Sequence, residues 1–136
     1  MPVNSHNEWD QLKEVIVGTA EGSAAVLSWN HPDPPSIDLM RNARELSKEA
    51  FPQWFLDEIA EDLDGLCQAI KDFGTVVHRP EVHDIGKTYS SPFWTSTGNN
   101  IYNVRDLHLV VGNTVIEAPS QHMARYFEAS ALYQIW

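Results

Sequence analysis

The clearest pattern in the chain is an apolar stripe between Phe51 and Gly74. Apolar residues recur there at steps of three and four: Phe55, Leu56, Ile59, Leu63, Leu66, Cys67, Ile70 and Phe73. This spacing is typical of one face of an amphipathic helix. Pro52 suits the first turn of such a helix, and Gly74 suits the position after its last turn. We therefore expect a helix over Phe51–Gly74, with Cys67 as a buried core residue.

Short β-branched and apolar runs flank this helix on both sides. Glu14–Val17 ends at a glycine, and Thr75–His78 ends shortly before Pro80, which cannot donate to a strand ladder. Both runs are expected to be strands, with His78 making a hydrogen bond at a strand end. Val26–Trp29 is a further candidate for an extended piece.

A hairpin is predicted in the last third of the chain. Leu107–Val111 and Thr114–Ile116 are strand-like, and Gly112-Asn113 between them suits a tight turn because glycine accepts a positive φ. After the hairpin, Ser120 is a suitable cap for a final helix. The apolar residues expected on that helix are Met123, Tyr126, Phe127, Leu132 and Ile135.

Two other segments are less regular in pattern. Ser36–Ala50 is weakly helical, with a solvated charged face, and Glu81–Ile101 is expected to be a long loop without regular structure. The order of strand, helix, strand, hairpin and helix predicts an α/β fold.

Charged residues gather at the open end of the predicted hairpin. Arg105 and Asp106 stand at the entry to its first strand, and Glu117 at the exit of its second. The two ends of a hairpin lie side by side, so one arginine and two carboxylates are expected together there.

Composition limits the classes of partner. The chain has 136 residues, 43% of them hydrophobic, which suffices for one domain with a core. Its net charge of −10 opposes binding to nucleic acid or anionic membranes and is compatible with a cationic substrate. A single cysteine fits the reducing cytoplasm, and Met1–Ser5 shows no signal-peptide pattern.

The histidines do not indicate a metal site. Their positions show no ligand spacing with each other or with Cys67: His6, His31, His108 and His122. His83 and Asp84 are adjacent, and adjacent side chains on an extended chain point apart. We expect neither a metal nor an organic cofactor.

Several motifs in order resemble the glycine (L-arginine) amidinotransferase family, in particular its bacterial branch that supplies amidino groups to secondary metabolites such as cyanobacterial guanidine toxins. These motifs are the opening Asn7–Gly18, then Thr97-Gly98, the Arg105-Asp106 pair with the apolar strand ending in Val110–Asn113, then Ile116–Pro119, and the helix with Arg125 and Phe127-Glu128. The resemblance covers most of the chain.

The resemblance implies a pentein fold, a five-module α/β propeller, of which residues 1–136 would form the first module and the start of the second. The chain ends inside an apolar helical pattern, so we expect a single domain truncated at its C-terminus. The family's nucleophilic cysteine and its His-x-Asp motif are not in this sequence, so we expect the chain alone to be inactive.

The resemblance also implies the function and the site. The whole enzyme would move the amidino group of L-arginine through a covalent cysteine intermediate to an amine, either glycine or a biosynthetic intermediate, and would work as a homodimer. Asp106 would bind the arginine guanidinium, and Glu117 is a second substrate-binding candidate. Alternatively, Asp106 forms a structural ion pair with Arg105 or Arg125, and Glu117 accepts backbone hydrogen bonds. Alternatives for the function are a guanidine hydrolase of the same fold and a stand-alone, non-catalytic domain for guanidine binding, amine binding or assembly.

Overall fold

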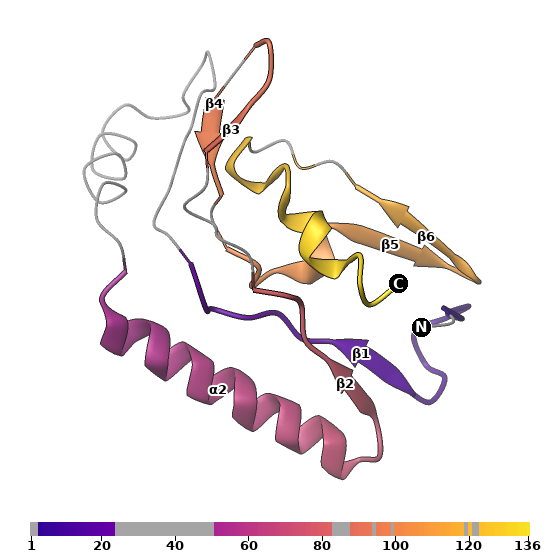
Figure 1. Cartoon of the computed structure of the whole chain (residues 1–136). Helices are drawn as coiled ribbons and strands as arrows, with labels where there is room; N and C mark the ends of the chain where they lie inside the picture. Colours follow the sequence, from indigo (N-terminus) through magenta and orange to yellow (C-terminus); the bar gives the residue numbers. More distant parts are fainter. Residues whose placement is uncertain are drawn as a thin grey trace, which may run out of the picture.

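The computed structural model describes residues 3–23, 51–82, 88–93, 95–98, 100–118, 120 and 123–136. The α-helix and the strands are β1 (Glu14–Ile16), α2 (Gln53–Asp72), β2 (Val76–His78), β3 (Thr88–Ser90), β4 (Thr95–Thr97), β5 (His108–Val111) and β6 (Thr114–Glu117). The 3₁₀ helices are η1 (Val104–Asp106), η2 (Met123–Arg125) and η3 (Glu128–Leu132). The predictions for Val26–Trp29 and Ser36–Ala50 lie outside the described residues. Together, the strands, α2 and the 3₁₀ helices are consistent with an α/β fold (Figure 1).

Helix α2 confirms the prediction for Phe51–Gly74 to within two residues at each end. Pro52 is its N-cap, and Gly74 follows its last turn with a φ of 83°, a conformation that glycine adopts without steric cost. The helix buries Leu63 and Cys67, whereas Phe73 at its end is exposed. Only the middle of the apolar stripe therefore faces the core.

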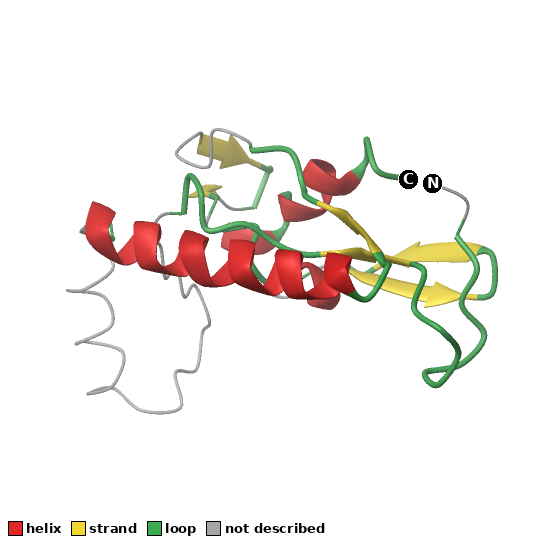
Figure 2. Ribbon diagram, turned by 90° about the horizontal axis from the view of Figure 1, so that it is seen from below, coloured by secondary structure: helices red, strands yellow, loops and turns green. Residues whose placement is uncertain are grey.

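Strands β1 and β2 pair in parallel, with Val15 opposite Val77. Parallel neighbours need a crossover connection, and the segment between them carries α2 along one side of the pair (Figure 2). Val17 and Ala20 form one core with Leu63 and Cys67 of the helix. Both predicted strands around the helix are thus confirmed.

A second core lies on the other side of β1. Leu107, Ala129 and Leu132 are buried together there, and Ile16 packs against them while Val15 packs against the first core. Successive side chains of a strand point to opposite faces, so β1 contributes to both cores. Full burial of a leucine side chain contributes about 1.5–3 kcal/mol to stability. This second core supports the charged residues described below.

The β5–β6 hairpin is confirmed as predicted. Leu109 pairs with Ile116, and Gly112 in the turn has a φ of 58°. The hairpin tip is attached to the N-terminal segment, because Ser5 and Gly112 exchange two backbone hydrogen bonds of 2.8 and 2.7 Å. These bonds fix the direction of the hairpin relative to β1.

The long helix predicted from Ser120 is wrong: η2 and η3 are two short 3₁₀ helices. A 3₁₀ helix has three residues per turn, so each third residue faces the same way. Ala129 and Leu132 face Leu107, and Ala131 one row away packs against Ile101. A period of three keeps Ala129 and Leu132 against Leu107 while Ala131 stays against Ile101, which explains the tighter helix.

The prediction of an irregular loop over Glu81–Ile101 is also wrong, because the segment contains the antiparallel pair β3–β4. Ser90 Oγ and Thr95 Oγ1 lie 3.0 Å apart across the pair. Threonine and tyrosine favour strands, but these strands are polar on both faces and show no apolar alternation. The usual sequence signal for a hairpin is therefore missing.

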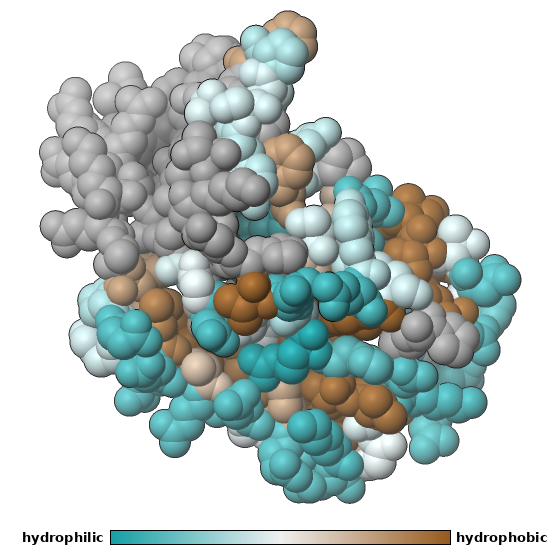
Figure 3. Space-filling view, in the orientation of Figure 1, coloured by the Kyte–Doolittle hydropathy of each residue, from teal (hydrophilic) through white to brown (hydrophobic). Residues whose placement is uncertain are grey.

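The surface mixes apolar and charged residues. Figure 3 shows apolar side chains in several separate patches among hydrophilic ones. Within the described ranges, no helix has the length and apolar character needed to cross a bilayer.

Candidate functional site

The predicted charged cluster forms at the open end of the β5–β6 hairpin. The register places His108 opposite Glu117, and Asp106 ends η1 with only Leu107 between it and β5. The Asp106 N–H donates to the Asn103 carbonyl at 3.1 Å, which closes the η1 turn. The structure therefore brings Asp106 and Glu117 to the same end of the hairpin.

The Asp106 carboxylate is held on one side by Arg125. Arg125 Nη1 lies 3.0 Å from Asp106 Oδ2, whereas Arg105 Nε lies 3.9 Å from Oδ1. The Arg125 ion pair, one of the alternatives left by the sequence, is therefore present. The Asp106 side chain is 44% exposed, so solvent and small ligands reach it despite this pair.

Arg125 is the centre of the cluster. Its Nε donates to Glu128 Oε2 at 2.8 Å, Nη1 to Asp106 Oδ2 at 3.0 Å, and Nη2 to the Asn103 carbonyl at 3.2 Å. Burial by itself lowers the pKa of Arg125, but the hydrogen bonds and charges of Glu128 and Asp106 outweigh it and raise the pKa. Arg125 therefore holds two carboxylates, Glu128 and Asp106.

Glu128 is a buried carboxylate that the sequence-based site did not include. Its side chain is 4% exposed, and Oε1 accepts the Asn100 N–H at 3.3 Å. Burial raises its pKa, and the hydrogen bond and charge of Arg125 partly oppose this change. The three-residue spacing of Arg125 and Glu128 is the sequence signal that would have indicated the pair.

Glu117 has a different partner from the one expected. Its Oε2 accepts the Tyr133 hydroxyl at 2.9 Å rather than a backbone group. This hydrogen bond, with small contributions from burial and from the Glu117 charge, raises the pKa of Tyr133. Both side chains belong to exposed residues. Glu117 is therefore accessible at the hairpin mouth but already has a hydroxyl partner.

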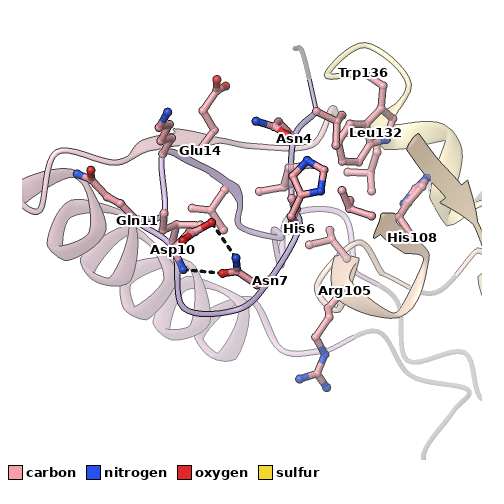
Figure 4. A pocket seen from close by; sticks show the side chains of 18 residues that line it. Asn4, His6, Asn7, Asp10, Gln11, Glu14, Arg105, His108, Leu132 and Trp136 are labelled. Carbon is pink, nitrogen blue, oxygen red and sulfur yellow. Dashed lines mark hydrogen bonds between the residues drawn. The ribbon is translucent and has the colours of Figure 1, made fainter. Parts of the chain in front are cut away.

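A cavity of about 610 Å³ has Arg105 and His108 among its lining residues (Figure 4). It is enclosed mainly by residues 3–7 and 10–16 of the N-terminal segment, with His108, Leu132 and Trp136 on its other side. Arg105 belongs to its wall, but Asp106 and Glu117 do not. The cavity wall also carries the carboxylates of Asp10 and Glu14, but each already has a partner: Asp10 Oδ2 accepts from Asn7 Nδ2 at 2.8 Å, and Glu14 Oε2 lies 2.8 Å from His78 Nε2.

His108 is the histidine of this cavity. Its ring centroid lies 5.4 Å from that of Trp136, and its buried Nδ1 has no hydrogen-bond partner among the described residues. Burial lowers the pKa of His108, and the charge of Glu117 partly opposes this effect. The ring is therefore held in its neutral form more strongly than in an unfolded chain.

The remaining candidates have structural roles or are not described. Cys67 is buried on α2 and accepts a hydrogen bond from Arg79 Nη1 at 3.1 Å, as expected for a core cysteine. His78 Nε2 lies 2.8 Å from Glu14 Oε2 at the end of β2, as expected. His83 and Asp84 lie outside the described residues. Within the described part of the chain, no three His, Cys, Asp or Glu residues are placed to hold a metal.

The chain is similar to amidinotransferases over almost all of its own length. It is 38% identical to the mitochondrial glycine amidinotransferase of Xenopus laevis over 138 residues, which covers 96% of this chain and 31% of that protein. It is 36% identical to the L-arginine:L-lysine amidinotransferase of Pseudomonas savastanoi pv. phaseolicola, with 96% of this chain and 36% of that protein covered. No protein-family model matches the chain.

The fold shows the same relationship. The solved structure of SxtG, an amidinotransferase from Microseira wollei in the saxitoxin biosynthetic pathway, superposes with a TM-score of 0.81 at 33% identity. The match covers 99% of this chain and 38% of SxtG. The chain thus spans about a third of the length of these relatives. Over that third, it belongs to the glycine/arginine amidinotransferase family.

Proposed function

We propose that the polypeptide carrying this segment is an amidinotransferase that moves the amidino group of L-arginine to an amine, and that Asp106 holds the guanidinium of the donor. The family relationship supports the reaction class. The observation that supports the site is the Asp106 carboxylate, which is half exposed to solvent and forms an ion pair with Arg125 through Oδ2.

The chemistry of the two groups fits. A guanidinium is planar, permanently charged and rich in N–H donors, and a carboxylate matches it with charge-assisted hydrogen bonds. Each such bond contributes about 1.5–3 kcal/mol. Because Arg125 engages Oδ2, Oδ1 supplies the acceptor for an incoming ligand, with the second lone pair of Oδ2 beside it. The net charge of −10 of the chain also favours a cation.

The covalent step that we propose proceeds in two stages. A cysteine thiolate attacks the central carbon of the guanidinium, the bond to the ornithine nitrogen breaks, and that nitrogen takes a proton from a general acid. The acceptor amine then attacks the amidino-cysteine carbon, loses a proton and releases the thiolate. Cys67 is unsuited to this step because it is buried in the core of α2. The reaction therefore needs a thiol outside these 136 residues.

The proposal includes an architecture and a setting. The segment forms the first module and the start of the second in a five-module pentein propeller, which the similarity to the SxtG structure supports. The enzyme is proposed to be a homodimer and to work in the cytoplasm. The single cysteine of this segment suits that reducing compartment. Glu117 is a second substrate-binding group at the hairpin mouth.

The test is release of ornithine from L-arginine by the whole polypeptide, with glycine and L-lysine supplied in turn as acceptors. We expect ornithine and a guanidino product in equal amounts, and the released ornithine should depend on the acceptor after the first turnover. Release of ammonia and citrulline instead would show a guanidine hydrolase. Binding of arginine without any turnover would show a non-catalytic binding domain and contradict the proposal.

A further inference from the structure

Three of the charged residues at the hairpin mouth form a continuous chain from solvent to the core. Asp106 is half exposed, Arg125 is 15% exposed and Glu128 is 4% exposed at the side chain. Each contact is a direct hydrogen bond: 3.0 Å from Arg125 to Asp106, and 2.8 Å from Arg125 to Glu128. The exposed carboxylate is therefore anchored to a buried one through a single guanidinium.

The geometry of Arg125 fixes the orientation of Asp106 as well as its position. The guanidinium is rigid and planar, so bonds from Nε and Nη1 to two carboxylates set the angle between them. Its third bond, from Nη2 to the Asn103 carbonyl, reaches the residue directly before η1. Arg125 thus holds both the side chain of Asp106 and the start of the turn that carries it.

Charge explains why a buried glutamate is needed in this arrangement. Both Glu128 oxygens accept hydrogen bonds, Oε2 from Arg125 and Oε1 from the Asn100 N–H, which is the pattern of an ionised carboxylate. Glu128 therefore balances the charge of Arg125. One cation between two carboxylates leaves a single net negative charge, and Asp106 is the end of the cluster that faces solvent.

A purely stabilising role does not explain this arrangement as well. A buried ion pair is weak evidence for stability, because the desolvation of two charges offsets their attraction. Arg105 offers a comparison, since it has the same charge and is adjacent to Asp106. The Arg105 side chain is 96% exposed, and its Nε lies 3.9 Å from Asp106 Oδ1. Water screens this charge, so Arg105 does not fix the orientation of the Asp106 carboxylate.

We infer that Arg125 and Glu128 are positioning residues: Arg125 orients the Asp106 carboxylate for a guanidinium, and Glu128 balances the charge of Arg125 so that the three-residue cluster keeps a net negative charge for a cationic substrate. This inference rests on the proposed function and adds two residues to its site. Neither residue needs to touch the substrate.

The experiment compares a cationic ligand with its neutral analogue in the whole polypeptide. L-arginine is the substrate, and L-citrulline, which has a urea in place of the guanidinium, is the neutral analogue whose competition with arginine is measured. The variants are Asp106→Asn, Arg125→Lys and the matched control Arg105→Lys. We expect both Asp106→Asn and Arg125→Lys to raise the KM for arginine at least tenfold, with kcat and the inhibition constant of citrulline changed less than threefold. Arg105→Lys should leave all three constants unchanged.

Arg125→Lys leaves the buried Glu128 poorly paired, which can prevent folding. A second variant therefore tests the inference in a protein without this unpaired charge. Replacing Arg125 and Glu128 together by methionine removes the buried pair and leaves no lone charge, which is often neutral for stability. This double variant should also raise the KM for arginine at least fivefold, because Asp106 is no longer anchored. If Arg125 and Glu128 had a merely structural role, replacing them would change the KM for arginine and the inhibition constant of citrulline alike, or would change neither.

The outcomes separate the two claims. In one outcome, Asp106→Asn is the only variant that raises the KM for arginine without changing the inhibition constant of citrulline. Arg125→Lys and the double variant then lack this effect, so the positioning inference is overturned and the proposed site stands. If Asp106→Asn leaves the KM for arginine unchanged, Asp106 is not the guanidinium site and both claims fail. If the wild-type polypeptide shows no ornithine release, the proposed function fails, and the inference fails with it.

Discussion

At the scale of single residues, the cluster shows how one side chain serves several others. Arg125 uses three N–H groups on three acceptors, and only an arginine provides that number in one plane. The consequence is that Asp106 is both accessible and oriented. The sequence left both Arg105 and Arg125 as possible ion-pair partners of Asp106, and the structure gives the closer contact to Arg125, nineteen positions later.

His108 should make stability depend on pH. Burial lowers its folded pKa from an ordinary value of about 6.5, so the unfolded chain binds protons more readily. The contribution of the neutral ring to stability is therefore complete above about pH 6.5 and is lost as the pH falls through the folded pKa. We expect wild type to lose more unfolding free energy between pH 7.5 and 5.5 than His108→Phe.

Urea unfolding of both proteins at the two pH values measures this difference. The other titrating groups, including the His78–Glu14 pair, are present in both proteins, so their contributions cancel. An equal loss in wild type and variant would show that the pKa of His108 is not lowered in the folded protein.

At the scale of elements, β1 and the segment after it connect the two cores. Thr19 N–H donates to the Ile101 carbonyl at 3.1 Å, which brings the residues before η1 against the end of β1. Gly18 makes this approach possible. A Cβ at that position would lie 2.0 Å from the Tyr102 carbonyl oxygen, so any larger residue forces the backbone to move.

Gly18→Ala should therefore destabilise the protein by about 1–3 kcal/mol, the usual cost of overpacking. Gly65→Ala is the matched control, because Gly65 lies within α2 and a Cβ there meets nothing within 4 Å. That change should stabilise the helix by about 0.5–1 kcal/mol. Thermal unfolding of both variants tests the opposite signs. Equal effects of the two alanines would show that the Gly18 contact is absent in solution.

The sequence predicted the elements that have a strong apolar period or a specific turn residue. The apolar stripe gave α2, and Gly112 with its flanking β-branched strands gave β5–β6. It did not predict β3–β4, because those strands are polar, or the 3₁₀ form of η3, because its two buried rows depend on Leu107 and Ile101 far away in sequence. Glu128 was missed as part of the site for the same reason: its burial is a tertiary property.

At the scale of the whole molecule, the position of the cluster follows from the two-core arrangement. Asp106 directly precedes Leu107, and Glu128 directly precedes Ala129, and both of these apolar residues belong to the second core. The charged residues are thus placed by packing on their immediate neighbours. A rigid support of this kind is what a binding site needs, because a carboxylate that moves loses part of its hydrogen-bond energy to ordering entropy.

The central claim is that Asp106 binds the guanidinium of L-arginine, and the most direct test measures kinetics and stability on one variant of the whole polypeptide. Asp106→Asn keeps the shape of the side chain and one acceptor for Arg125 but removes the charge. We predict a ten- to hundredfold loss in kcat/KM for arginine, by the rule of about 1.4 kcal/mol per decade. The unfolding free energy should fall by less than about 1 kcal/mol, because the Asp106–Arg125 pair is partly exposed. Normal arginine kinetics together with a clearly lower Tm would instead show that Asp106 only braces Arg125, and would contradict the proposed site.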